Sequence, residues 1–97
     1  MNKIWTKDEL TFNKWSKERI ALGRKFCTSR SKNYGSDPRV KFVVDIQLKY
    51  VRDFLFQTEG ADSPEEFEKV WRSLHRGRFN QEDYVVVHFG DFREIKK

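Results

Sequence analysis

Residues that could cross-link the chain are scarce. The sequence of 97 residues has one cysteine, Cys27, and two histidines, His75 and His88. A single cysteine excludes a disulfide within the chain and is typical of a reducing compartment, so we expect a cytoplasmic protein. No pair of these side chains has the spacing of metal ligands, and the sequence therefore predicts neither a metal site nor a cofactor. Without a base partner, Cys27 is expected to be a small core residue.

Long apolar runs are also missing. No run could span a bilayer, and residues 1–10 lack the apolar core of a signal peptide, so we expect no contact with membranes. The chain has two prolines and five glycines, and no repeat or linker divides it. A chain of this length can form one hydrophobic core without covalent staples. The sequence thus predicts a single domain over residues 1–97.

Aromatic residues and positive charge are abundant instead. Phe, Trp and Tyr supply 15% of the residues, which favours a packed core over disorder. The formal net charge is +5 and is unevenly distributed: residues 1–57 hold 13 Lys and Arg against 6 Asp and Glu, whereas residues 58–97 hold 7 against 9. An anionic partner is therefore expected at the first half of the chain.

Two helices are predicted. Apolar and long side chains recur at helical spacing over residues 12–22, and Gly23 follows in the position of a C-terminal cap. The second helix begins at Ser63, with Pro64 at its first position and Glu66 completing a capping box, and it ends at Gly77. A further capping-box pattern at Thr6–Glu9 favours a turn or helix start near Thr6.

The strand signals lie between and after these helices. Residues 40–51 alternate and are rich in β-branched residues, which predicts one bent strand or two strands. The face expected to be apolar contains Phe42, Val44, Ile46, Leu48 and Tyr50. Residues 84–89 are apolar on both faces, which is typical of a central strand. Strands combined with short helices favour a small mixed α/β barrel or roll.

The segment GRKFCTSR, residues 23–30, contains a dense set of polar side chains. In a regular strand Lys25, Cys27 and Ser29 would face one way, and the alternating set Phe26, Thr28 and Arg30 the other. Such a segment is either a solvated edge strand or the wall of a pocket.

This segment resembles the Gly-x-Lys-x-x-Thr/Glu-x-Arg signature of the ASCH domain, a member of the PUA-like superfamily. The signature positions are occupied by Gly23, Lys25, Thr28 and Arg30. A second block, EGADSPEEFEKVWRSLH followed by a Gly-containing loop and YVVVHF, is similar to the helix and closing strand of archaeal and bacterial ASCH proteins. The two blocks together cover most of residues 10–92. Residues 36–41 depart from the family, which usually has a Gly-Asp turn there.

The resemblance implies an α+β fold: a PUA-like mixed β-barrel of five or six strands, flanked by two or three short helices. It also implies a cleft that many relatives use for RNA or a modified base. Small acetylcytidine amidohydrolases of the family are more similar still, and their pattern places Lys25, Thr28 and Glu59 in a catalytic site.

Catalysis by Lys25, Thr28 and Glu59 would require their side chains to meet in one cleft. A threonine hydroxyl is a weak nucleophile that needs an adjacent base, which a buried lysine can supply, while a carboxylate can position the lysine or bind an exocyclic amine. In a regular strand Lys25 and Thr28 point to opposite faces, so a shared cleft requires a bulge or bend near Cys27. The alternative is an exposed Lys25 and a Thr28 packed in the sheet.

Basic residues cluster around the signature, with one aromatic among them. These expected contacts to nucleic acid are Arg24, Lys25, Arg30, Lys32, Tyr34 and Arg39. Positive side chains match a phosphate backbone, and an aromatic ring gives an unpaired base a surface to stack on. The alternative is a solvated basic face.

Together these observations favour a domain that binds RNA or a modified nucleotide in a basic cleft. The alternative is a small amidohydrolase acting on an acylated nucleoside such as acetylcytidine, or a ribonuclease. Whether the chain turns over a substrate, and its oligomeric state, stay open at this point.

Overall fold

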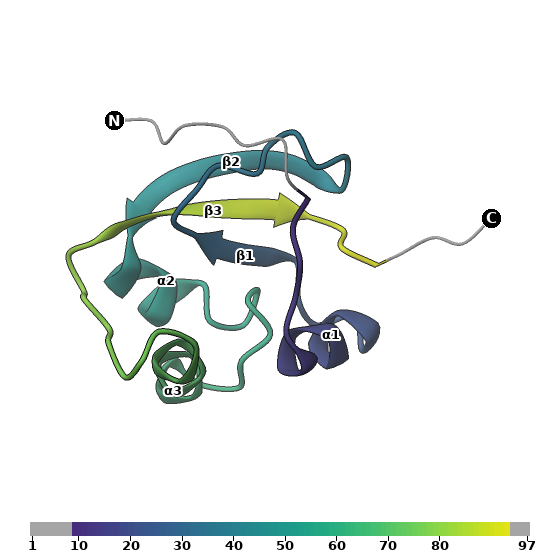
Figure 1. The fold of residues 1–97 in the computed structure, drawn as a ribbon. Coiled ribbons are helices and arrows are strands. Elements are labelled where there is room, and N and C mark those ends of the chain that lie inside the picture. The colour runs from purple at the N-terminus through teal and green to yellow at the C-terminus, as the bar shows by residue number, and fades with distance from the viewer. Residues whose placement is uncertain (1–8, 94–97) are drawn as a thin grey trace.

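In a computed structural model that describes residues 9–93, the chain forms three helices and one three-stranded sheet (Figure 1). The helices are α1 (Lys14–Ala21), α2 (Leu48–Phe54) and α3 (Pro64–Leu74), and the strands are β1 (Cys27–Arg30), β2 (Val40–Gln47) and β3 (Tyr84–Gly90). The capping-box pattern near Thr6 begins outside the described residues. None of the helices in this part of the chain is long and apolar enough to cross a membrane.

The sheet is open and has the order β1-β3-β2, with both pairings antiparallel. The last strand in the sequence is thus the central one, and Val85–His88 of β3 are buried, which confirms the predicted central strand. The α+β class is confirmed as well. The expected barrel of five or six strands does not form within residues 9–93, where β1 and β2 each keep one edge without a partner strand.

The difference from the predicted strands lies at Leu48. Residues 40–47 are extended, but residues 48–54 are helical, so the prediction of one or two strands over residues 40–51 is wrong in its last third. Leu48 and Val51 are buried three residues apart, a spacing that places both on the inner face of a helix. The expected apolar face of the strand is only partly covered, because Phe42 and Val44 are exposed.

The helices begin where local signals predict. Asn13 caps α1 by accepting a hydrogen bond from the Ser16 N–H at 2.8 Å, and Gly23 follows the helix with a φ of 72°. Ser63 caps α3 by accepting from the Glu66 N–H at 3.0 Å. This helix ends at Leu74, earlier than expected, and a turn continues to Gly77.

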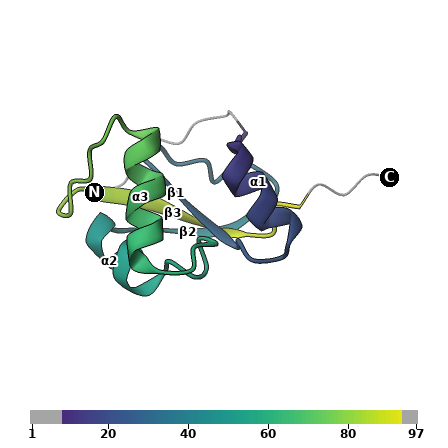
Figure 2. The ribbon, with the colours of Figure 1, turned by 90° about the horizontal axis from the view of Figure 1, so that it is seen from below.

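All three helices lie on the same side of the sheet (Figures 1 and 2). The main core cluster joins Val85 and Val87 of β3 to Val51 of α2 and Phe67 of α3. A second cluster forms around Leu10, Ile20 and Phe92.

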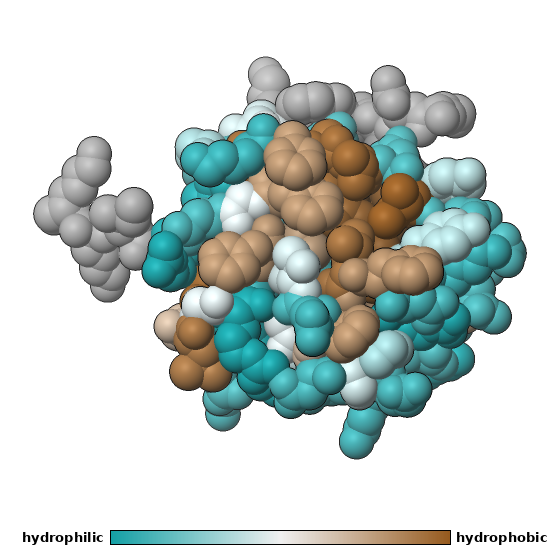
Figure 3. Space-filling model, turned by 180° about the vertical axis from the view of Figure 1, so that it is seen from behind, coloured by the Kyte–Doolittle hydropathy of each residue, from teal (hydrophilic) through white to brown (hydrophobic). Residues whose placement is uncertain are grey.

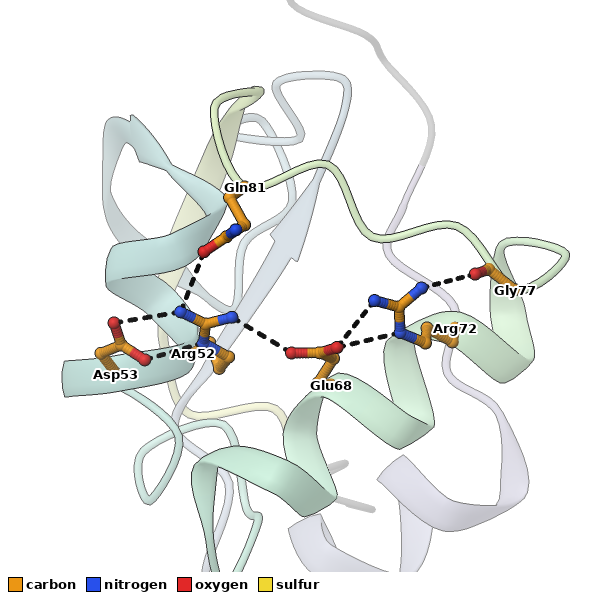
Figure 4. Close-up of polar contacts among 6 residues, drawn as sticks. All are labelled: Arg52, Asp53, Glu68, Arg72, Gly77 and Gln81. Atoms are coloured by element: carbon orange, nitrogen blue, oxygen red, sulfur yellow. Dashed lines mark hydrogen bonds and ion pairs between the residues drawn. The ribbon is translucent and has the colours of Figure 1, made fainter.

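A network of charged residues ties α2 to α3 (Figure 4). Arg52 of α2 donates to the Glu68 carboxylate of α3 at 3.1 Å, and Arg72 donates to the same carboxylate at 2.8 Å. Arg72 also donates to the carbonyl oxygen of Gly77 at 2.7 Å, which holds the turn after α3 against the helix. Because the network lies near the surface, we expect it to contribute little to the free energy of folding.

Candidate functional site

A cavity of about 300 Å³ lies beside the edge strand β1, between α1 and α3. Its walls combine aromatic rings with polar side chains that are otherwise buried. The polar members include Lys25, Thr28, Ser29, Arg30 and Glu59, and the aromatic members include Trp15, Tyr34, Phe67 and Trp71. A concave, mostly apolar site with a few converging polar groups is the usual form of a small-molecule pocket.

The turn between α2 and α3 places Glu59 against this cavity. The Glu59 N–H donates to the carbonyl of Leu55, and the Gly60 N–H donates to that of Gln57, both at 2.9 Å. Gly60 has a φ of 100°, a conformation that side-chain-bearing residues rarely adopt. The turn also passes close to α1, because a Cβ atom on Gly60 would lie 2.9 Å from that of Arg19. The carboxylate of Glu59 is thereby directed at β1.

Lys25, Glu59 and Ser29 form one buried hydrogen-bonded network. The Lys25 ammonium donates to Glu59 Oε1 at 2.8 Å and to the Glu59 carbonyl oxygen at 2.9 Å. The Ser29 hydroxyl donates to Glu59 Oε2 at 2.6 Å. The side chains of Lys25 and Glu59 are 3% and 5% exposed, so this ion pair is almost completely withdrawn from water. We call this set the Lys25–Glu59–Ser29 network.

The backbone before β1 bonds to the turn that carries Glu59. The N–H groups of Phe26 and Cys27 both donate to the carbonyl of Thr58, at 2.8 and 3.2 Å. β1 pairs with β3 without a register shift, so the bulge expected near Cys27 is not present within Cys27–Arg30. Lys25 and Thr28 nevertheless both line the cavity, although a regular strand would point them to opposite faces.

Thr28 lies outside the network. Its hydroxyl oxygen accepts a hydrogen bond from Arg30 Nε at 3.3 Å, and Arg30 Nη2 donates to the Thr11 carbonyl at 2.5 Å. The Arg30 guanidinium also lies 5.8 Å from the centroid of the Tyr34 ring. Burial lowers the pKa of Arg30 from its usual value. Among the residues described, Thr28 therefore contacts a cation and no base.

The aromatic walls come from both neighbouring helices. Trp15 of α1 and Trp71 of α3 are half-buried and pack against the main core cluster, and each also lines the cavity. The ammonium of Lys25 lies 6.0 Å from the centroid of the Trp15 ring. His75 stacks on Trp71 with ring centroids 4.0 Å apart. The cavity is thus lined both by two tryptophan rings and by the charged and hydrogen-bonding side chains of the Lys25–Glu59–Ser29 network.

Three of the predicted nucleic-acid contacts lie away from the cavity. Arg24 forms an ion pair with Asp62, and Arg39 forms one with the buried Asp37 at 2.7 Å. Lys32 is exposed and does not line the cavity. The structure therefore brings together Lys25, Arg30 and Tyr34 of the predicted basic cluster, and leaves the rest on other parts of the surface.

Two buried groups next to the site are inert. Burial raises the pKa of the Cys27 thiol far above its usual value, and the side chain belongs to the core, as predicted. His88 is completely buried, and its Nε2 accepts from the Tyr34 N–H at 2.8 Å while Nδ1 lies 3.2 Å from the Thr28 carbonyl. This pattern requires a neutral ring with its proton on Nδ1. Burial also lowers the pKa of His88.

The sequence interpretation missed Ser29, Trp15 and Trp71 as site residues. Both tryptophans lie at helical spacing on apolar stripes, which favours a core position; they pack against the main core cluster and also line the cavity. Ser29 had a usable signal, because strand alternation places it on the same face as Lys25.

Comparison with known proteins finds no family model, no curated protein and no solved structure that matches this chain. Within residues 9–93, no three His, Cys, Asp or Glu side chains are grouped as metal ligands.

Proposed function

We propose that the cavity binds a nucleobase, presented by a free modified nucleoside or by an unpaired RNA nucleotide. The observation that carries this proposal is the placement of Trp15 and Trp71 around the Lys25–Glu59–Ser29 network in one small cavity. A base offers a flat π surface that stacks on aromatic rings and a polar edge that forms hydrogen bonds. A volume of about 300 Å³ suits a single base rather than a nucleic-acid duplex.

The polar floor favours a base with both an amine and a carbonyl. Two of the three Lys25 N–H groups are used by Glu59, and the third has no acceptor among residues 9–93. This N–H can donate to a carbonyl, while the Glu59 carboxylate keeps lone pairs that accept from an exocyclic amine. Cytosine and guanine carry both groups, so we expect them to bind more tightly than uracil or adenine. The resemblance of residues 23–30 to the ASCH signature supports the same assignment.

Calorimetric titration with the four nucleosides and with N4-acetylcytidine tests this function. We expect binding of cytidine-type or guanosine-type ligands, and weaker binding by Trp71→Leu, which removes a stacking surface. Phe54→Leu is the matched control, because Phe54 is an exposed aromatic that does not line the cavity. The proposal fails if no nucleoside binds at millimolar concentration, or if Trp71→Leu binds as tightly as wild type.

Hydrolysis of an acylated nucleoside is the second candidate, and the contact between Ser29 and Glu59 favours it. A hydroxyl already bonded to a carboxylate is a nucleophile with its base in place. As Ser29 Oγ attacks the acyl carbon, Glu59 would take the hydroxyl proton and pass it to the departing amine. The remaining Lys25 N–H could stabilise the oxyanion. Water would then release the acyl group from Ser29.

Release of cytidine from acetylcytidine separates the two candidates and identifies the nucleophile. Ser29→Ala should abolish turnover if the Glu59-bonded hydroxyl attacks, whereas Thr28→Val should abolish it if the family pattern holds. Binding without turnover by wild type would reject the hydrolase and leave the base-binding function.

A further inference from the structure

The outer part of β2 carries apolar side chains that no element of residues 9–93 covers. Phe42 is 57% exposed and Val44 is 38% exposed. Both face the same side of the sheet, because they pair with Phe89 and Val87 of β3, and the rings of Phe42 and Phe89 stack 4.7 Å apart. Apolar side chains gather into one area of the molecule when it is seen from behind (Figure 3). An area of this kind is typical of a contact surface.

The backbone beside this surface is also available. β2 pairs with β3 on one edge, and its other edge has no strand partner within the described part of the chain. An unpaired edge with apolar side chains is a template for another strand. Lys41 is the extra residue of a bulge between Val40 and Phe42, so the regular part of the strand begins at Phe42, next to Lys41.

We propose that β2 pairs with β2 of a second copy of the chain, antiparallel and centred on Val43. In this register Lys41 lies opposite Asp45 of the second copy, and Phe42 lies opposite Val44 of the second copy. The two-fold symmetry repeats each contact, so the interface gains two opposite-charge pairs and two apolar pairs. The sequence of the strand is thus complementary to itself in charge and in hydrophobicity.

Neighbouring registers lack the charge pairs. Centring the pair on Val44 keeps an apolar pair, Phe42 opposite Ile46, but it places Lys41 opposite Gln47 and Val43 opposite Asp45. Centring it between Val43 and Val44 places Phe42 opposite Asp45. A shift of one residue also moves side chains to the wrong face of the sheet. The register centred on Val43 joins the two sheets into one of six strands and brings the exposed apolar residues of both copies together.

Reciprocal charge reversal tests the register. Lys41→Asp alone places two carboxylates opposite each other at both ends, and Asp45→Lys alone places two ammonium groups there. Each variant should therefore raise the dissociation constant of the dimer, by about tenfold. An equimolar mixture of the two variants pairs opposite charges again and should associate as tightly as wild type. Sedimentation across a range of protein concentrations, at physiological salt, measures all three samples.

Lys69→Asp and Glu18→Lys are the matched controls, because they make the same changes of net charge at exposed positions on α3 and α1, away from β2. Three outcomes would overturn the proposal. The first is a wild type that stays monomeric up to its solubility limit. The second is a dimer that the β2 variants weaken no more than the controls do. The third is a monomer in which the β2 amides that point away from β3 resist hydrogen exchange, because another part of the same chain would then cover the edge.

Discussion

At the residue scale, we expect substitutions in the buried pair of Lys25 and Glu59 to have a large effect on stability. Both side chains are withdrawn from water, so each charge depends on the other. We expect Glu59→Gln to lower the free energy of unfolding by about 3–5 kcal/mol, because it leaves the ammonium without a counter-charge. Lys25→Met combined with Glu59→Leu should cost less than Glu59→Gln alone. Urea denaturation measures both changes.

The exposed pair of Asp91 and Arg93 provides the control. Its side chains are 43% and 58% exposed, and exposed pairs contribute little to folding. Asp91→Asn should leave the urea midpoint nearly unchanged. Equal effects of Asp91→Asn and Glu59→Gln would show that the buried pair has no special role.

Gly60 is the second sensitive residue, because its substitution would disturb the turn that carries Glu59. Gly60 and Gly23 both have a positive φ, but a Cβ atom at Gly23 would meet nothing within 4 Å. Gly23→Ala should therefore lower the free energy of unfolding only by the cost of an alanine at positive φ, about 1–2 kcal/mol. Gly60→Ala adds a clash with Arg19 and should cost more and weaken ligand binding. Thermal unfolding and nucleoside titration of the two variants compare these costs, and equal losses would contradict the steric argument.

His88 should make stability depend on pH below neutrality. Its folded-state pKa lies below the ordinary 6.5, mainly because of burial. Between the folded-state value and 6.5 the unfolded chain binds more protons, so the free energy of unfolding must fall as the pH is lowered through this range. Asp37 acts in a separate range, because its hydrogen bond from Arg39 holds its pKa at about 2, and its contribution is lost only below pH 3.8.

Urea titrations at several pH values between 7 and 4 measure this dependence. His88→Gln should flatten the curve in that range, whereas His75→Gln, at an exposed position, should leave the slope in place. A slope that survives in His88→Gln would assign the effect to another group.

At the element scale, α3 depends on its cap. Ser63 accepts the Glu66 N–H, and the helix carries Phe67 and Trp71 to the core and the cavity wall. Ser63→Ala should lower the free energy of unfolding by about 1 kcal/mol. Ser73→Ala is the comparison, because Ser73 is exposed and bonds only to the Val70 carbonyl of the same helix. If both variants unfold at the same urea concentration, the cap does not stabilise α3.

The elements show what the sequence could predict. Caps and glycines act over a few residues, so the start of α3 followed from Ser63 and Pro64, and the end of α1 from Gly23. The cap at Asn13 was not predicted. The change from strand to helix at Leu48 did not follow from such local signals. Alternation and helical spacing both fit the apolar residues of this segment, and packing of Leu48 and Val51 against the core decides for the helix.

The residues of the candidate site could also be predicted only in part. Lys25, Thr28 and Glu59 were predicted from the resemblance to the ASCH family, and all three line the cavity. Alternation places Ser29 on the face of Lys25, but its bond to the Glu59 carboxylate did not follow from a pattern, because it depends on where the turn at Gly60 directs that carboxylate. Such a contact between residues 30 positions apart is set by tertiary packing alone.

At the scale of the whole molecule, the net charge of +5 overstates the charge available to an RNA backbone. Arg24 and Arg39 are engaged with carboxylates, whereas Lys32 is exposed. We expect nucleoside binding to be nearly independent of salt. Binding of a short single-stranded RNA should weaken with a slope of about −0.7 per phosphate neutralised.

Fluorescence anisotropy over a series of potassium chloride concentrations measures these slopes. Lys32→Ala should reduce the slope for RNA by about 0.7, and Arg24→Ala should reduce it less, because Asp62 already neutralises that charge. Equal reductions would mean that Arg24 leaves Asp62 when RNA binds.

The strand order β1-β3-β2 also governs how the chain can fold during its synthesis. Translation produces β1 and β2 first, but these strands do not pair with each other. Each pairs with β3, which is formed by residues 84–90. A nascent chain that ends before Tyr84 therefore holds two unpaired strands, and Ile46 of β2 lacks the core contacts that Val85 and Val87 of β3 complete. Because synthesis proceeds at about 5–20 residues per second, this interval lasts for seconds on the ribosome. We therefore expect chaperones that bind apolar segments of nascent chains to bind residues 40–47 until β3 has been synthesised and has paired with β2.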